Sequence, residues 1–243
     1  MAEYGELRDI MILTAHQPQY LPGLRLFDKI ARADVFVYLD TVPMESSGYE
    51  NRNKIKTAQG WQWLTVPISR KGYQGKMVRE IEIDYTQQNW QKKHRKAIEF
   101  AYGKAPWFEW FPKFLFEWLY TERFQLLTTL NGHMICILLD ALGIKTEFRW
   151  ANVDEFQGHK SDLVLDMCKK LGATKYIFGV KGRDYAKVED FERAGIELEF
   201  QDYQHPVYPQ LHGEFLPNMS VVDLLMNCGP KSLQVLTCGN LKK

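Results

Sequence analysis

The chain has few cysteines, and none of them stands in a metal-binding pattern. Its four cysteines are far apart in the sequence, with no CxxC pair and no histidine at zinc-finger spacing. A structural zinc site or a disulfide framework is therefore not expected. The first residues carry no basic segment that leads into a long apolar run, so we expect no signal peptide. These absences together predict a cytoplasmic protein with reduced thiols.

The chain also lacks a long hydrophobic run and an excess of either charge. Its longest apolar run, near residues 135–139, is far shorter than a membrane span. With 31 basic and 30 acidic residues there is no global field to concentrate polyanions. We therefore expect neither a nucleic acid nor a membrane as the partner. No GxxxxGK[ST] or GxGxxG motif follows an expected strand, so a nucleotide site would need another architecture.

What the chain does have is ample apolar material, with 45% hydrophobic residues, which excludes a disordered chain. An apolar run at 10–15, helical spacing from Leu24 to Arg32 and a second apolar run at 34–39 predict a βαβ unit. Strands at 148–151, 175–178 and 196–200 alternate with helices at 161–171 and 185–194. Short helices from Ser220 and Pro230 follow. This alternation predicts an α/β fold with a mostly parallel, Rossmann-like sheet.

The middle of the chain is predicted to be a helical insertion within a single α/β domain that spans 1–243. Three helical segments are expected between about 86 and 145, at 90–102, 106–119 and 124–142. The second is covered with aromatic rings on nearly every side, so we expect it to be core or to dock a partner. Strands are expected at 61–68 and 80–83, whereas the polar stretch 41–60 shows no strand pattern.

Polar side chains follow the first two expected strands. Because ligands bind beyond the carboxyl ends of parallel strands, His16, Gln17 and Asp40 are candidate site residues. His16 is the candidate proton donor or acceptor, with a backbone-bonded loop histidine as the alternative. Asp40 is either a turn cap, a metal ligand or the partner of a substrate amine or hydroxyl.

Further candidates come from two other polar segments. In the segment 51–54, Arg52 and Lys54 suit phosphate or carboxylate, and Asn51 and Asn53 suit hydroxyl groups; a solvated turn is the alternative. The second segment carries His205, Tyr208 and His212. We favour an aromatic wall of a polar pocket there over a metal site, because no third ligand stands at a recognisable spacing.

Cys228 is a weaker candidate for a nucleophile, with His16 or His205 as its base. The alternative is a small buried apolar side chain, which free cysteines usually are.

Several blocks of the chain resemble the WbqC-like family. The segment from His16 to Gly23 (HQPQYLPG), with FDKI at 27–30 and ADVFVYLD at 33–40, is similar to that family's opening. NRNKI at 51–55 followed by WLTVP at 63–67 is similar to its second block. KKLGATKYI at 169–177 and FLPNMSVVDLL at 215–225 are similar to its closing blocks. The residues that match its most recognisable motifs are Gln17, Pro18, Tyr20, Pro22, Asp40, Asn51, Arg52 and Asn53.

The resemblance implies a transferase of surface-polysaccharide or other secondary biosynthesis, which passes an acyl or aminoacyl group to an amino sugar or nucleotide sugar. It implies no required cofactor, and a donor that can be held on a carrier protein. In this interpretation His16 and Asp40 are catalytic. The substrate-binding residues are Gln17, Tyr20, Asn51, Arg52, Asn53, Lys54, His205 and Tyr208, and no metal is involved. The alternatives are a non-catalytic binding or scaffold protein and a Cys- or metal-dependent hydrolase.

Aromatic residues make up 14% of the chain and fall into two groups. Those between Trp107 and Tyr120 belong to the ring-covered helix and indicate core or interface. The others flank the polar motifs, and we expect them to line a sugar-sized cleft. This second group contains Tyr20, Tyr38, Trp61, Trp63, Tyr203 and Tyr208.

Overall fold

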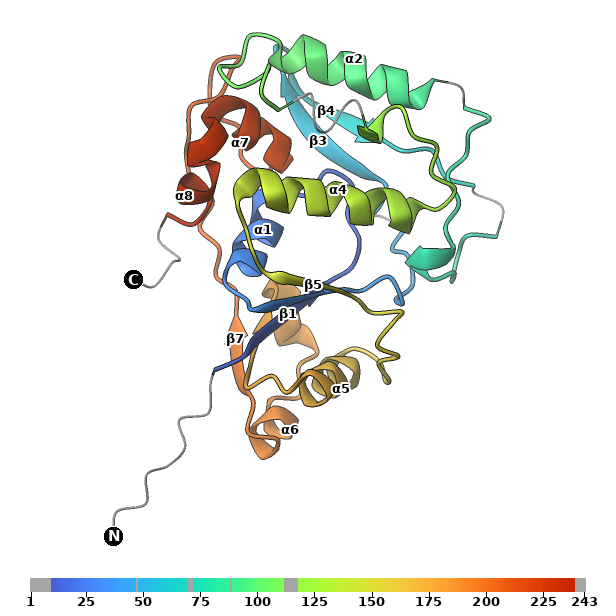
Figure 1. Ribbon diagram of the computed structural model, residues 1–243, viewed down its shortest axis with the longest axis vertical. Coiled ribbons are helices and arrows are strands. Elements are labelled where there is room, and N and C mark those ends of the chain that lie inside the picture. The colour runs from blue at the N-terminus through green and yellow to red at the C-terminus, as the bar shows by residue number, and fades with distance from the viewer. Residues whose placement is uncertain (1–9, 47, 70–71, 88, 112–117, 239–243) are drawn as a thin grey trace.

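A parallel sheet of five strands lies at the centre of the protein and confirms the predicted α/β fold. The computed structural model describes residues 10–46, 48–69, 72–87, 89–111 and 118–238 (Figure 1). The strand order is β5-β2-β1-β6-β7, and every pairing within this sheet is parallel. The strands are β1 (Ile12–His16), β2 (Val35–Tyr38), β5 (Glu147–Trp150), β6 (Lys175–Phe178) and β7 (Glu197–Phe200).

The central strand β1 fixes where a ligand is expected. It pairs with β2 on one side and with β6 on the other, and His16 lies opposite Tyr38. The chain therefore proceeds outward from β1 first through β2 and later through β6 and β7. Such a reversal of strand order opens a crevice at the carboxyl ends of the two strands that flank it, here β1 and β6.

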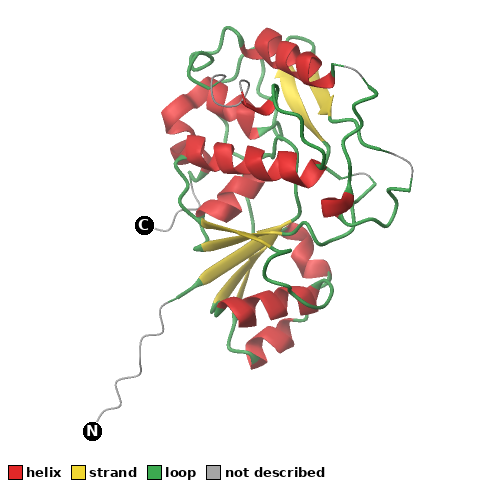
Figure 2. Ribbon diagram, turned by 45° about the vertical axis from the view of Figure 1, so that its right-hand side comes forward, coloured by secondary structure: helices red, strands yellow, loops and turns green. Residues whose placement is uncertain are grey.

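The helices cover the sheet on both faces (Figures 1 and 2). The larger layer contains α1 (Leu24–Ala31), α2 (Trp90–Tyr102), α4 (Leu127–Leu142), α7 (Val221–Cys228) and α8 (Ser232–Leu236), and the opposite face holds α5 (Ser161–Leu171) and α6 (Val188–Arg193). Side chains alternate between the two faces, as in any strand. Phe36 and Tyr38 join the larger hydrophobic cluster, whereas Val35 and Val37 join the smaller one. No helix among the described residues is long and apolar enough to cross a membrane.

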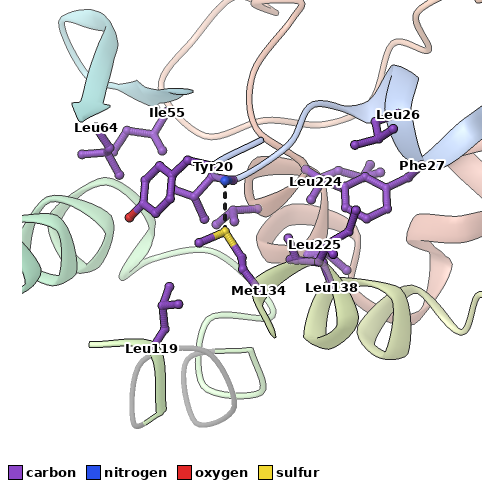
Figure 3. Packing of buried hydrophobic residues seen from close by; sticks show 14 of the residues in the cluster. Tyr20, Leu26, Phe27, Ile55, Leu64, Leu119, Met134, Leu138, Leu224 and Leu225 are labelled. Atoms are coloured by element: carbon purple, nitrogen blue, oxygen red, sulfur yellow. Dashed lines mark hydrogen bonds between the residues drawn. The ribbon is translucent and has the colours of Figure 1, made fainter. Parts of the chain in front are cut away.

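A β-hairpin that the sequence pattern did not predict packs on the larger layer. It consists of β3 (Arg52–Thr57) and β4 (Gly60–Thr65). The stretch 41–60, which shows no strand pattern in the sequence, therefore contains a strand in its second half. Arg52 and Lys54 alternate with the buried Asn53 and Ile55. The outward positions of β3 are charged, which hides its apolar period. Figure 3 shows the inward Ile55 and Leu64 beside Tyr20.

Two other expected elements differ in the structure. Residues 80–83 were expected to be a strand, but the chain forms a 3₁₀ turn (Val78–Glu80) followed by single bridges from Ile83 to Ile68 and from Glu82 to Leu126. Three helices begin later than the pattern predicted: α4 begins at Leu127, α6 at Val188 and α8 at Ser232. A 3₁₀ turn directly precedes α8 and another (Val180–Asp184) lies ahead of α6, and short 3₁₀ segments commonly precede helices.

The ring-covered helix expected at 106–119 lies partly outside the described residues. Within the described part, residues 106–110 form turns, and Trp107 and Trp110 are exposed. Trp107 lies against Gly229, where a Cβ would overlap its indole ring. The described residues of the expected insertion include α2 and α4, which contribute to the same hydrophobic cluster as α1.

The loop between β1 and α1 is held by the hairpin and by α4. Leu21 adopts a φ of 44°, an uncommon conformation for a large side chain. Its carbonyl accepts a 2.7 Å bond from Asn53, and its amide lies 3.0 Å from the Met134 sulfur (Figure 3). The neighbouring Tyr20 amide donates to the Tyr49 carbonyl at 3.0 Å. The hairpin and α4 thus hold this loop from two sides. Gln17 therefore has a fixed position relative to the start of β3.

Candidate functional site

The crevice between β1 and β6 contains a histidine with two cations around it. His16 is partly buried at the end of β1, and its Nδ1 lies 2.8 Å from the Gln17 carbonyl oxygen. Because a carbonyl accepts, Nδ1 carries the proton and Nε2 keeps its lone pair. Burial, followed by the charge of Lys29, lowers the pKa of His16 to about 3. His16 is therefore a neutral imidazole at physiological pH, suited to accept a hydrogen bond.

Lys29 places a buried amine at the same crevice. Its Nζ donates to the Ala15 carbonyl of β1 at 2.8 Å and lies 4.0 Å from the position of a Cβ on Gly179, just after β6. Only 2% of Lys29 is exposed, and this burial lowers the pKa of its amine to about 7. The exposed Lys181, in the 3₁₀ turn after β6, adds a second positive charge that also acts on His16. This side of the sheet edge suits an anionic group.

The β2 side of the same edge carries a buried carboxylate instead. Asp40 follows β2 and is fully buried. Its backbone carbonyl accepts from the Arg79 amide at 3.0 Å. Neither carboxylate oxygen makes a hydrogen bond of good geometry within the described residues. Burial raises the pKa of Asp40 above 3.8, although its own amide, the charge of Arg79 and the Asn152 amide oppose that rise.

Glu50 brings a second buried carboxylate to the region. Its Oε1 accepts from Gln17 Nε2 at 2.9 Å and from the Glu45 amide at 3.2 Å. Its Oε2 has no partner among the described residues, and burial raises the pKa of this carboxyl group as well. Gly48 is needed here, because a Cβ at that position would overlap the Glu50 carboxylate. The Glu50 backbone carbonyl in turn accepts from Asn131 of α4 at 2.7 Å.

Buried oxygens without hydrogen-bond partners occur on two residues of α4 and on the two carboxylates. Thr128 and Asn131 stand three residues apart on α4, so they lie on one face of that helix. Thr128 also binds β2, since its backbone carbonyl accepts from the Tyr38 hydroxyl at 2.8 Å. Most of the buried side-chain atoms that lack a hydrogen bond in the described structure belong to this acceptor group: both Asp40 oxygens, Glu50 Oε2, Thr128 Oγ1 and Asn131 Oδ1. Every one of them can accept a hydrogen bond, and only the Thr128 hydroxyl can also donate one, so the group has more acceptors than donors.

Two surface hollows lie away from this edge of the sheet. One of about 330 Å³ is lined by Glu82, Tyr85, Arg123 and their neighbours. The other, of about 380 Å³, is lined by residues that include Asp34, just before the start of β2, and so lies at the opposite end of the sheet. We place the site at the carboxyl edge nonetheless, because unpartnered buried acceptors are costly unless something binds them. The acceptor group is closed to solvent in this state of the protein.

The structure brings His16, Gln17 and Asp40 to one edge but does not pair the histidine with the aspartate. The charges that shift the pKa of His16 come from Lys29 and Lys181, and both act against protonation. Gln17 bridges the two sides, since it follows His16 directly and donates to Glu50. The edge is therefore divided into a cationic side at β1 and β6 and an acidic side at β2.

In the segment 51–54, two side chains bond inside the fold and two lie on the outer face of the hairpin. Asn51 and Asn53 donate to backbone carbonyls of Val66 and Leu21, at 2.9 and 2.7 Å, so both amides hold the chain. Arg52 and Lys54 lie on the outer face of the hairpin, over tryptophan rings. Only the two cations therefore have side chains directed away from the fold.

The structure places four of the six rings expected in a cleft inside the protein instead. Tyr20, Tyr38, Tyr203 and Tyr208 are at most 8% exposed, whereas Trp61 is 51% exposed. The Tyr20 hydroxyl lies 2.8 Å from His94 Nδ1 and 3.1 Å from the Tyr120 hydroxyl. Large apolar rings with one polar tip pack well in a core when that tip finds a partner, and the sequence pattern did not distinguish this use from a cleft.

The tyrosine at 208 belongs to a second buried polar cluster, around Asp223 of α7. The Tyr102 and Tyr208 hydroxyls donate to its carboxylate at 2.9 and 2.8 Å, and Gln210 Nε2 donates at 2.7 Å. Lys56 adds a positive charge that lowers the pKa of Asp223, against the larger opposite effect of burial. This carboxylate is hydrogen-bonded at both oxygens, which indicates a role in holding the fold together.

His205 and Cys228 have no contact with the sheet edge among the described residues. His205 Nδ1 lies 2.9 Å from the Pro206 carbonyl, and its Nε2 accepts from the Asn218 amide at 3.1 Å. Both ring nitrogens are thus used by the backbone. Burial, followed by the charge of Asp223, raises the pKa of the Cys228 thiol, which disfavours a thiolate nucleophile. The described residues contain no group of three or more His, Cys, Asp or Glu side chains that is arranged to hold a metal ion.

Sequence reasoning missed Lys29, Glu50 and Asn131. Asn131 did carry a signal, because it stands in a helix that is otherwise apolar on most sides. Lys29 belongs to a short helix between two buried strands, which leaves few solvated positions. Glu50 precedes the recognised segment 51–54 directly. In each case the burial of the polar group, and not its identity, reveals its role.

Comparisons with known proteins give the same family that the motifs of the chain resemble. The family model of the WbqC-like protein family matches residues 17–235. An uncharacterized protein of Mycobacterium tuberculosis is 34% identical over 217 residues, which covers 89% of this chain and 93% of that protein. No solved structure matches the chain significantly. The family model begins directly after β1 and covers the other four strands of the sheet, the hairpin and the acceptor group, and the chain belongs to the WbqC-like protein family.

Proposed function

We propose that this protein transfers an acyl or aminoacyl group to the amine of an amino-sugar acceptor, in the biosynthesis of a surface polysaccharide or a secondary metabolite. The single observation that carries the proposal is the pair of buried carboxylates, Asp40 and Glu50, in which both Asp40 oxygens and Glu50 Oε2 lack a side-chain hydrogen-bond donor. A primary amine supplies up to three N–H donors and, when protonated, a positive charge. It therefore suits a buried carboxylate better than a hydroxyl, which has one donor.

The divided edge supports a transfer between two ligands. On the β1 and β6 side, Lys29, Lys181 and the lone pair of His16 suit the anionic end of a donor, such as a phosphate or a carboxylate. On the β2 side, Asp40 and Glu50 suit the acceptor amine. Proximity of the two bound ends is what such a reaction needs, because it replaces a bimolecular encounter.

Asp40 would act as the general base in this mechanism. An ammonium group bound to Asp40 gives up a proton to the carboxylate, whose raised pKa favours that transfer. The free amine then attacks the acyl carbonyl, a C–N bond forms, and the bond to the donor's leaving group breaks. The leaving group departs with its electron pair and takes up the second proton that the attacking nitrogen loses as the amide forms. His16, a neutral imidazole, accepts a hydrogen bond throughout and takes no proton.

The acceptor preference can be tested without knowledge of the donor. We propose a ligand-observed NMR titration of the protein with glucosamine and with glucose, which differ only by an amine in place of a hydroxyl. We expect glucosamine to bind about tenfold more tightly, since hydrogen bonds to charged groups contribute about 1.5–3 kcal/mol. Asp40→Asn should abolish this preference. Equal binding of the two sugars, or a preference that survives in Asp40→Asn, would overturn the proposal.

A further inference from the structure

The outer face of the β3–β4 hairpin carries a row of aromatic rings with cations between them. We define the hairpin face as Tyr49, Arg52, Lys54, Trp61 and Trp63. The ring centroids of Tyr49 and Trp63 are 5.9 Å apart, and so are those of Trp61 and Trp63. Trp61 is 51% exposed and Tyr49 is 43% exposed. The row is therefore open to solvent over much of its length.

The two cations lie directly against these rings. Lys54 Nζ is 4.3 Å from the Trp61 centroid and 5.1 Å from the Trp63 centroid, and the Arg52 guanidinium is 4.9 Å from the Trp63 centroid. These contacts hold the long side chains close to the sheet. Lys54 forms no ion pair with any acidic residue that the structure describes. The nearest carboxylate along the chain, Glu50, is buried and directed toward Gln17.

The hairpin face continues into the candidate site. Tyr49 and Asn51 flank Glu50 in the sequence, and Arg52 Nε donates to the Gly48 carbonyl at 3.4 Å. Gly48 in turn lies against the Glu50 carboxylate. A ligand on the hairpin face would thus have one end near the acidic side of the sheet edge. Trp107 and Trp110, the other exposed tryptophan pair, have no cation over their rings within the described residues.

We propose that the hairpin face binds a nucleoside diphosphate. An exposed indole stacks on the planar base, and the cations beside it meet the phosphate oxygens. The inference rests on the proposed function in that the diphosphate would tether the sugar whose amine reaches Asp40. Two cations match one diphosphate, whereas a nucleic acid requires contacts to many phosphates. A neutral sugar would stack on the rings but would leave Lys54 without a partner.

The test is a calorimetric titration of the full chain with uridine diphosphate and adenosine diphosphate, beside uridine, pyrophosphate and a single-stranded RNA of ten nucleotides. We expect saturable binding of at least one diphosphate, weakened about tenfold when either the base or the phosphates are removed. Trp61→Ala and Lys54→Gln should each weaken the binding by about tenfold. Trp110→Ala is the matched control and should leave the affinity unchanged, with circular dichroism as the check that each variant folds.

The outcomes separate this inference from the proposed function. Asp40→Asn should bind the diphosphate as the unmodified protein does, even though it loses the preference for glucosamine. If neither diphosphate binds, or if Trp61→Ala binds as well as Trp110→Ala, the hairpin face is not a nucleotide site, and the glucosamine result stands by itself. Tighter binding of the RNA than of either diphosphate would overturn the proposal in favour of a nucleic-acid surface.

Discussion

Two buried carboxylates of this protein, Asp40 and Asp223, have opposite surroundings. Both residues are fully buried. Asp223 accepts hydrogen bonds from the Tyr102 and Tyr208 hydroxyls and from Gln210, and Lys56 supplies a nearby positive charge. Asp40 has no side-chain donor in the described structure and meets only backbone amides, its own and that of Asn152. Burial alone therefore does not distinguish a structural carboxylate from a functional one, whereas the supply of donors does.

The largest expected effect is on catalysis at the unsatisfied carboxylate. Asp40→Asn should lower the rate of acyl transfer to an amine by about a hundredfold or more, since a general base contributes that much. The free energy of unfolding should stay the same or rise, because the variant removes a buried charge without donors. Urea denaturation and a transfer assay on the same preparation check both. Lower stability of Asp40→Asn would show that Asp40, like Asp223, has a structural role.

Asp223→Ala should show the opposite pattern. It leaves the buried Tyr102 and Tyr208 hydroxyls without their acceptor, so we expect it to lower the free energy of unfolding by about 3 kcal/mol. Tyr208→Phe, which removes a single donor, should cost about 1 kcal/mol. Where these variants stay folded, the preference for glucosamine should remain. If Asp223→Ala were as stable as the unmodified protein, the cluster would not have the structural role assigned to it.

Lys29 should make the stability depend on pH above neutrality. Its pKa in the folded protein is about 7, below the value of 10.5 for a solvated lysine. Between these values the unfolded chain binds more protons, so stability rises with pH by up to about 1.4 kcal/mol per unit. Lys29→Met should abolish this rise between pH 7 and about pH 9. The same variant should weaken binding of an anionic donor, while Lys92→Met, on the exposed surface of α2, should change neither.

The smallest effects concern the shape of the acidic side and the titration of His16. Gly48→Ala should displace the Glu50 carboxylate, since a Cβ there would overlap it, and should lower the affinity for glucosamine by a few-fold, about 1 kcal/mol. Gly75→Ala serves as a comparison, because open space surrounds that position and any effect there comes from its positive φ and not from a clash.

With a pKa of about 3, His16 should leave no inflection near 6.5 in the pH dependence of the transfer rate. An inflection near 6.5 that disappears in His16→Gln would contradict the neutral role given to this histidine. It would also restore the histidine as the catalytic base.

The strands of the main sheet were predictable because β1, β2 and β6 are short, mostly apolar runs, whereas β5 and β7 alternate charged and apolar residues. The hairpin was not, since its outward positions are Arg52 and Lys54, and half-buried polar strands show no apolar period. At the site, position along the strands was enough to find His16, Gln17 and Asp40. It was not enough to show that His16 and Asp40 have separate surroundings. Lys181 acts on His16, and Arg79 and Asn152 act on Asp40, and all three are distant in the sequence from the residue on which they act.

Tyr20 and Tyr208 illustrate the remaining gap between sequence and structure. Both stand within polar motifs, and both bury their rings and bond their hydroxyls inside the protein. Lys29 and Glu50 are the converse case, in which charged residues that a sequence pattern assigns to solvent are buried at the sheet edge. Which polar group is buried without partners depends on packing between distant segments, and only the folded structure reveals it.

We infer that the Asp40 carboxylate is held without a side-chain donor until an amine binds. It can be tested by following the ¹³C-carboxyl NMR signal of Asp40 through a pH titration, first alone and then with glucosamine or glucose. We expect Asp40 to have a pKa above 3.8 in the free protein. This pKa should fall when glucosamine is added and should not change with glucose. An ordinary pKa in the free protein, or one that glucosamine does not change, would contradict it.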